Sequence, residues 1–169
     1  MIALALQAIG APALIVGGKM PANWAKDAIA PEMQFIPSRG ARQSAIALKS
    51  AHDRLRKGGI VAIAADGEDG QLGLRAPFLG RSIRVSRGLA ALARLTGAPI
   101  IPILTTWGEE DWTADLRIFD ALTPMEAKEP VAWDRETIRQ VVGRFEQIVR
   151  ATPGQFRMEK LSRYSGEGG

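Results

Sequence analysis

Apolar residues recur along this chain in two patterns that together predict alternating strands and helices. Continuous apolar runs predict strands at 13–16, 33–37, 60–65 and 99–105, with a more exposed strand at 116–119. The run at 60–65 is of the kind that is buried on both faces of a parallel sheet. Strands that alternate with helices are typical of an α/β fold, in which helices flank a mostly parallel sheet.

Apolar positions three and four residues apart predict the helices. One helix is expected from about Ser44 to Lys57, ended by Gly58–Gly59. A second is expected to follow Ser86 as its N-cap and to stop at Gly97. The clearest periodicity is expected to start at Asp134 and to end before Pro153–Gly154.

The apolar N-terminus also predicts a helix rather than a membrane span. Gln7, Gly10 and Pro12 interrupt it before the ~20 apolar residues that a span requires, and no basic residue precedes the apolar run. We therefore expect the last turns of a helix at 2–9. A chain that opens inside a helix–strand unit suggests that a further segment precedes it.

Composition fits one soluble globular domain. The chain has 169 residues, of which 46% are hydrophobic and 24% charged. Such a length is enough for one domain with a real core. We expect a single domain over residues 1–164 and a flexible tail over 165–169.

The chain contains no cysteine and a single histidine, His52. The absence of cysteine excludes disulfides, Cys-ligated metal centres and a thiolate nucleophile. A single histidine excludes a metal site with several histidine ligands. We expect no metal and no resident cofactor.

Positive charge is concentrated in the middle of the chain. Residues 39–94 hold eleven Lys and Arg against four acids, whereas residues 109–169 hold nine against twelve. This pattern suits an anionic partner: a phosphate-bearing small molecule, an anionic membrane surface or, least favoured, nucleic acid. A solvated basic face is the alternative, and no recognition helix or RNA-binding pattern occurs.

Three loop segments could carry chemistry at the carboxyl ends of the predicted strands, where open α/β sheets bind ligands. The first, 35–42, places two arginines before a helix N-terminus, which favours anions. The second, 64–70, has three carboxylates between glycines, although its Asp-Gly pair could be only a tight turn. The third, from Pro77 to Arg81, is followed by Arg84 and Arg87, and it ends a long loop that is expected over 66–81.

Six segments form an ordered series along the chain. They are Phe35-Ile36 leading to Arg39, Ala65-Asp66-Gly67, Pro77-Phe78-Leu79-Gly80-Arg81, Gly88-Leu89-Ala90-Ala91-Leu92-Ala93, Gly97-Ala98-Pro99-Ile100-Ile101-Pro102-Ile103, and Pro153-Gly154-Gln155-Phe156 with Arg163-Tyr164. This series resembles the successive blocks of the glycerolipid and lysophospholipid acyltransferase superfamily. It is most similar to the bacterial lipid A biosynthesis (lauroyl/myristoyl) branch, and the resemblance covers nearly the whole chain.

The resemblance implies transfer of an acyl chain from acyl carrier protein or acyl-CoA to a hydroxyl of a phosphorylated lipid, such as a lipid A precursor. It also implies a protein peripheral to the inner face of the bacterial inner membrane. No nucleic acid is implied. The substrate-binding residues that it suggests are Arg39 and Arg42 for acceptor phosphate, Asp66 and Gly67 in the second block, and Phe78, Arg81 and Arg84 in and after the third.

One part of the family pattern is missing. The family's general base is a histidine in a His-x-x-x-x-Asp/Glu motif, in which the carboxylate orients the ring. Here His52 is followed five positions later by Lys57, and it lies after Arg39 whereas the family's histidine precedes that block. His52 is better interpreted as a partly buried helix residue, and Asp53 is expected to point away from it because adjacent helix residues do not share a face.

Two hypotheses follow. The chain is an N-terminally shortened acyltransferase that lacks the first elements of the fold and its catalytic base, so that no catalytic residue lies within it. Alternatively, it is a non-catalytic protein that binds an anionic lipid or an acyl thioester without turnover.

Overall fold

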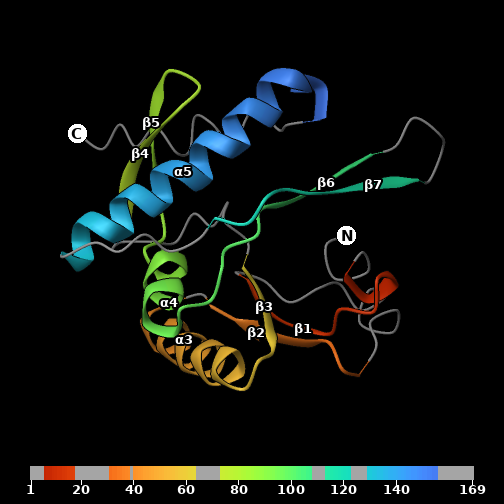
Figure 1. The fold of residues 1–169 in the computed structure, drawn as a ribbon, viewed down its shortest axis with the longest axis vertical. Helices are drawn as coiled ribbons and strands as arrows, with labels where there is room; N and C mark the ends of the chain where they lie inside the picture. Colours follow the sequence, from red (N-terminus) through yellow and green to blue (C-terminus); the bar gives the residue numbers. More distant parts are fainter. Residues whose placement is uncertain are drawn as a thin grey trace. The chain divides into compact units, whose positions relative to one another are not determined.

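A computed structural model describes residues 6–17, 31–38, 40–63, 73–107, 113–122 and 129–155. The chain divides into two compact units, residues 1–69 and residues 70–169. Figure 1 shows the elements of both.

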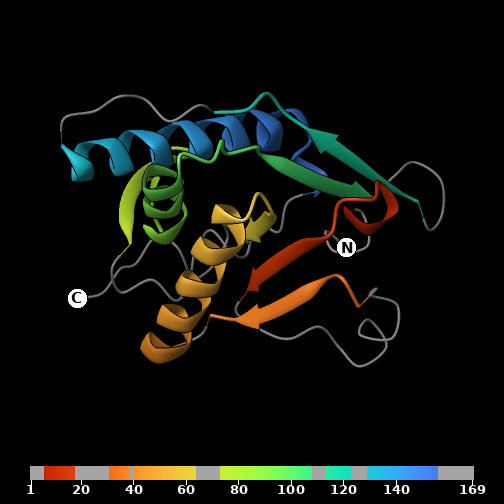
Figure 2. The same cartoon turned by 60° about the horizontal axis from the view of Figure 1, so that its bottom comes forward.

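The first unit is a parallel sheet with one helix packed on it. Its strands are β1 (Ala13–Gly17), β2 (Gln34–Pro37) and β3 (Ile60–Ile63), in the order β2-β1-β3, and helix α3 (Ala41–Arg56) contacts all three (Figure 2). The central strand β1 is paired on both edges, and its residues 13–16 are buried. The parallel sheet predicted from the sequence is confirmed for this unit. The described strands of the second unit pair antiparallel, so the prediction of a mostly parallel sheet is wrong there.

Two details of this unit differ from expectation. Residues 60–63 of the strand predicted at 60–65 form β3, and residues 64 and 65 lie outside the described residues; β3 is not buried on both faces, because Ile60 is 44% exposed and residues 61–63 are only partly buried. The helix predicted from Ser44 begins three residues earlier, at Ala41. Its first turn carries no apolar periodicity, so the pattern could not reveal it. Residues 6–8 form part of the helix predicted at 2–9, whose other residues except Ile9 lie outside the described ranges.

The second unit combines two antiparallel strand pairs with helices. Its elements are β4 (Leu74–Phe78), β5 (Arg81–Val85), α4 (Gly88–Thr96), β6 (Ile103–Trp107), β7 (Ala114–Ile118), α5 (Pro130–Ala151) and the short 3-10 helix η1 (Pro153–Gln155). β4 pairs with β5, and β6 pairs with β7. Helix α5 packs on β4 and on α4, and these contacts form the core of the unit (Figure 1).

The core of the second unit is made by the apolar faces of the β4–β5 hairpin and of the two helices. Alternate residues of the hairpin point into it, because side chains on a strand alternate between faces. The buried members are Ala76, Phe78, Val85, Ala90, Ala93, Trp133, Ile138, Val142 and Val149.

The long loop predicted over 66–81 is wrong where the structure describes it. Residues 74–78 form β4, and a two-residue turn at Leu79 and Gly80 leads directly into β5. Both turn residues have positive φ, 51° and 76°, which suits the tight turns of hairpins. Glycine and charge are abundant in this stretch, and they concealed the apolar alternation that a half-buried strand requires.

The other elements of this unit are shifted relative to expectation. The strand predicted at 99–105 runs from Ile103 to Trp107, and Ile100 makes only an isolated bridge to Leu122. The exposed strand expected at 116–119 is present as β7. Helix α4 is ended by Gly97 as predicted, with Gly97 in the left-handed conformation, but its N-cap is Arg87 rather than the predicted Ser86. Helix α5 begins at Pro130, so the prediction that Asp134 starts it is wrong.

Candidate functional site: an arginine-bearing sheet edge

The three parallel strands of the first unit end at the same edge of their sheet. Gly17 at the end of β1 pairs with Pro37 at the end of β2, and Val16 pairs with Ile63 at the end of β3. The chain segments that follow β2 and β3 therefore leave from one edge. In open α/β folds this carboxyl edge is where ligands bind.

The connection from β2 to α3 is fixed by backbone and side-chain bonds. The Ser38 N–H donates to Gly17 O at 2.8 Å, and the Ser44 hydroxyl donates to Ser38 O at 2.6 Å. Gly40 has φ 87° and ψ 156°, a conformation that is essentially restricted to glycine. These interactions set where α3 begins relative to the strand ends.

Arg42 lies in the first turn of α3, immediately after this connection. Its side chain is exposed, and it makes no ion pair or hydrogen bond with the residues that the structure describes. No acidic residue occupies the first turn of the helix. The helix N-terminus and the guanidinium both favour an anion at this place.

Three of the predicted site residues, Arg39, Asp66 and Gly67, lie outside the described residues. In the sequence Arg39 falls between Ser38 and Gly40, and Asp66 follows the end of β3 at Ile63 by three positions. Their suggested contacts with substrate stay predictions.

The remaining predicted residues belong to the second unit. Phe78 is 5% exposed and packs in the core, whereas Arg81 and Arg84 are exposed on β5. Arg81 pairs across the hairpin with Phe78, and Arg84 pairs with Arg75. Sequence reasoning missed Arg75, although the alternation on either side of the Leu79–Gly80 turn was the signal that could have found it.

Arg87, which the sequence grouped with the anion-binding arginines, instead holds a buried carboxylate. Its Nε donates to Asp134 Oδ2, and Arg94 Nε donates to Asp134 Oδ1 at 2.9 Å. Asp134 is fully buried, and the pair of bonds joins α4 to α5. Burial alone would raise the pKa of this carboxyl, but the hydrogen bonds and charges of Arg94 and Arg87 outweigh it and hold the pKa below its usual value.

His52 is half-exposed on α3. Its Nδ1 lies 3.4 Å from Asp53 Oδ1, so the expectation that Asp53 points away is wrong. The hydrogen bond with His52 is the main cause that lowers the pKa of Asp53, and Lys49 contributes. His52 follows Arg42 by ten positions on α3, or about 15 Å along the axis, which places the His52–Asp53 pair far from the sheet edge.

The described residues contain neither a cluster of metal ligands nor a membrane-spanning helix. No group of three or more His, Cys, Asp or Glu side chains there could hold a metal ion. None of the helices in that part of the chain has the length and apolarity to cross a bilayer.

Most of the chain matches a known protein family. Residues 30–160 match the model of the family described as bacterial lipid A biosynthesis acyltransferase. The chain belongs to this family. The match includes the β2–α3 connection, the β4–β5 hairpin and α5, and it confirms the resemblance found in the sequence. A search of curated proteins finds no match.

Proposed function

We propose that this chain takes part in the transfer of a fatty acyl group from acyl carrier protein or acyl-CoA to a hydroxyl of a phosphorylated lipid, such as a lipid A precursor. In that reaction the hydroxyl oxygen attacks the thioester carbonyl, a C–O bond forms, the C–S bond breaks and the thiol leaves with the proton. Membership of the acyltransferase family supports the reaction class. We further propose that the protein works at the inner face of the bacterial inner membrane.

The observation that carries this proposal is the β2–α3 connection at the carboxyl edge of the parallel sheet. It sets Arg42 in the first turn of a helix that has no carboxylate there to neutralise it. Arg39 is the neighbouring residue that the family pattern favours for the same role. We assign to this edge the phosphate of the acceptor lipid, because guanidinium groups bind phosphate in a bidentate manner.

One observation favours a second candidate, a protein that binds an anionic lipid or an acyl thioester without transferring the acyl group. The sequence contains one histidine, and the residue five positions after it is Lys57 rather than an acid. The contact between His52 and Asp53 does not replace the missing motif, because it lies about 15 Å along α3 from Arg42.

A single assay separates the two candidates. The chain is incubated with a labelled acyl thioester and a phosphorylated lipid acceptor, and both binding and labelled product are measured. Labelled acceptor supports the acyltransferase. Binding of thioester or acceptor without product supports the second candidate. Failure to bind either compound contradicts both.

The sheet-edge site is tested with a matched pair of variants on the same helix. Arg42→Gln should weaken binding of the phosphorylated acceptor about tenfold or more, as expected for the loss of a charge-assisted contact. Arg56→Gln removes the same charge from the other end of α3, where the side chain is also exposed, and should leave binding nearly unchanged. Arg39→Ala should act as Arg42→Gln does. If Arg42→Gln and Arg56→Gln weaken acceptor binding equally, the acceptor is held by general electrostatic attraction and not by a specific site at the sheet edge.

A further inference from the structure

Two arginines face each other on the β4–β5 hairpin. Arg75 on β4 pairs directly with Arg84 on β5, so their side chains leave the same face of the hairpin. The Cβ atoms of directly opposite residues lie about 4.5–5.5 Å apart, and like charges in that position destabilise the pair of strands. Leu74, Ala76 and Phe78 occupy the other face, which packs in the core.

No carboxylate neutralises this pair in the part of the chain that the structure describes. Residues 73–86 contain three arginines and no acid. Neither Arg75 nor Arg84 makes a hydrogen bond or ion pair with a described residue. The acidic residues of α5 are bonded to other arginines: Asp134 to Arg87 and Arg94, Glu136 to Arg139, and Glu146 to Arg150.

The local structure also shapes the surface beside the pair. A Cβ added at Gly73 would collide with Arg84 Cγ and lie 2.9 Å from Val85 O, so the stem of Arg84 lies closely against the glycine backbone. A shallow hollow of about 460 Å³ continues from Arg75 toward the turn, and Ser82 and Arg81 are among its lining residues. Ser82 adds a hydroxyl donor on the same face as Arg75 and Arg84, because it pairs with Pro77.

We propose that the face of the β4–β5 hairpin bearing Arg75, Ser82 and Arg84 binds a phosphate group. Two guanidinium groups that no carboxylate of the described residues neutralises attract a dianion, and their planar donors match phosphate oxygens. This site belongs to the second unit and does not rest on the proposed acyl transfer. Its occupant is a phosphate carried either by a lipid headgroup or by a soluble molecule.

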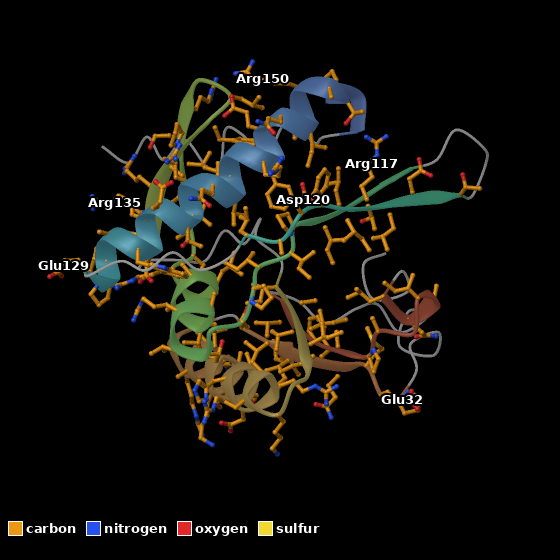
Figure 3. All side chains as sticks on the ribbon, in the orientation of Figure 1. Glu32, Arg117, Asp120, Glu129, Arg135 and Arg150 are labelled. Carbon is orange, nitrogen blue, oxygen red and sulfur yellow. The ribbon has the colours of Figure 1, made fainter. Side chains whose placement is uncertain are left out.

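The first experiment titrates the whole chain with inorganic phosphate and follows the Nε–H signals of its arginines by NMR. We expect saturable shifts at Arg75 and Arg84. Arg75→Gln and Arg84→Gln should each weaken the affinity about tenfold or more. Arg135→Gln is the matched control, because Arg135 is an exposed arginine that projects from α5 in the same unit (Figure 3). An equal loss with Arg135→Gln, or no saturable binding, would overturn the proposal.

A second measurement checks that any loss of binding is not a loss of fold. Removal of one arginine relieves the cross-strand repulsion, so Arg75→Gln and Arg84→Gln should unfold at the same temperature as the parent or up to about 4 °C higher. Lower unfolding temperatures in both variants would contradict the proposed repulsion between the two arginines.

The source of the phosphate is decided with vesicles. Phosphatidylcholine vesicles that contain one part in five of phosphatidic acid are sedimented with the parent and with Arg75→Gln/Arg84→Gln. Sedimentation that depends on the two arginines and is reversed by inorganic phosphate assigns the site to a lipid headgroup. Saturable binding of inorganic phosphate without vesicle binding assigns it to a soluble phosphate ester.

Discussion

Two pairs of arginines in the second unit differ in what faces them. Arg87 and Arg94 converge on the buried carboxylate of Asp134, whereas Arg75 and Arg84 face each other across a hairpin with no described carboxylate beside them. The first pair stabilises the packing of α4 on α5. The second pair weakens the hairpin that carries it. The second unit thus contains one arginine pair that stabilises the fold and another that is available to a ligand.

The largest effect should come from removing the shared carboxylate. Asp134→Asn leaves two guanidinium groups against a neutral side chain, and removing one partner of a buried pair costs about 3–5 kcal/mol. Because Arg87 and Arg94 are 38% and 26% exposed, we expect about 3 kcal/mol by urea denaturation at pH 7. Asp120→Asn, at an exposed position, is the control and should change stability by less than about 0.5 kcal/mol. Equal stability of both variants would contradict the assigned role of Asp134.

The stabilising effect of Asp134 should depend on pH. The pKa of this carboxyl is lowered in the folded protein, so its contribution is present above the unfolded value of 3.8 and is lost as pH falls through the folded pKa. The difference in free energy of unfolding between the parent and Asp134→Asn should therefore be full at pH 7 and pH 5 and smaller at pH 3. Glu136, whose pKa is lowered to about 2 by Arg139, is present in both proteins and cancels. A difference that grows toward pH 3 would contradict this sign.

Smaller losses are expected when one arginine of the stabilising pair is removed. Arg87→Gln and Arg94→Gln each leave Asp134 with one guanidinium, and each should cost about 1–3 kcal/mol by thermal unfolding. Arg94→Gln should be the more costly, because Arg94 is the less exposed of the two. Arg135→Gln is the control and should leave the unfolding temperature nearly unchanged. If Arg87→Gln and Arg94→Gln also leave it unchanged, the two hydrogen bonds to Asp134 do not contribute to stability.

The smallest effect, and one of opposite sign, is expected at the other pair. Arg75→Glu places a carboxylate directly opposite Arg84, and such a cross-strand pair should add about 0.2–1 kcal/mol of stability. The same change should abolish phosphate binding by the hairpin. If Arg75→Glu is less stable than the parent and still binds phosphate, then Arg75 and Arg84 neither repel each other nor form the phosphate site.

Sequence periodicity predicted the first unit well because its strands are simple apolar runs. The parallel sheet and the end of β2 were expected, but the start of α3 was not, because Arg42 was expected before the helix and lies in its first turn. Asp134 was misread because an acid before an apolar helical pattern looks like an N-cap. A buried acid gives the same pattern, and its arginine partners are 40 and 47 residues away. The residues near Asp134 in the sequence give no indication of its pairing with Arg87 and Arg94.

The candidate sites show the same division between local and non-local information. The grouping of Arg84 with Arg87 followed from their nearness in sequence, but strand pairing gives Arg84 the partner Arg75, and helix packing gives Arg87 the partner Asp134. The contact of His52 with Asp53 was missed for a different reason. Adjacent helix residues leave in different directions, but flexible side chains can still bring Nδ1 to 3.4 Å from a carboxylate oxygen.

The tight turn at Leu79 and Gly80, both with positive φ, limits which insertions and deletions the β4–β5 hairpin can accept. A two-residue turn fixes which residue of β4 meets which residue of β5. One extra residue in the turn would shift this correspondence by one position and carry Arg84 to the face opposite Arg75. The chain would keep every arginine, but Arg75 and Arg84 would no longer lie on the same face of the hairpin. The length of the turn is thus as much a determinant of phosphate recognition here as the guanidinium groups themselves.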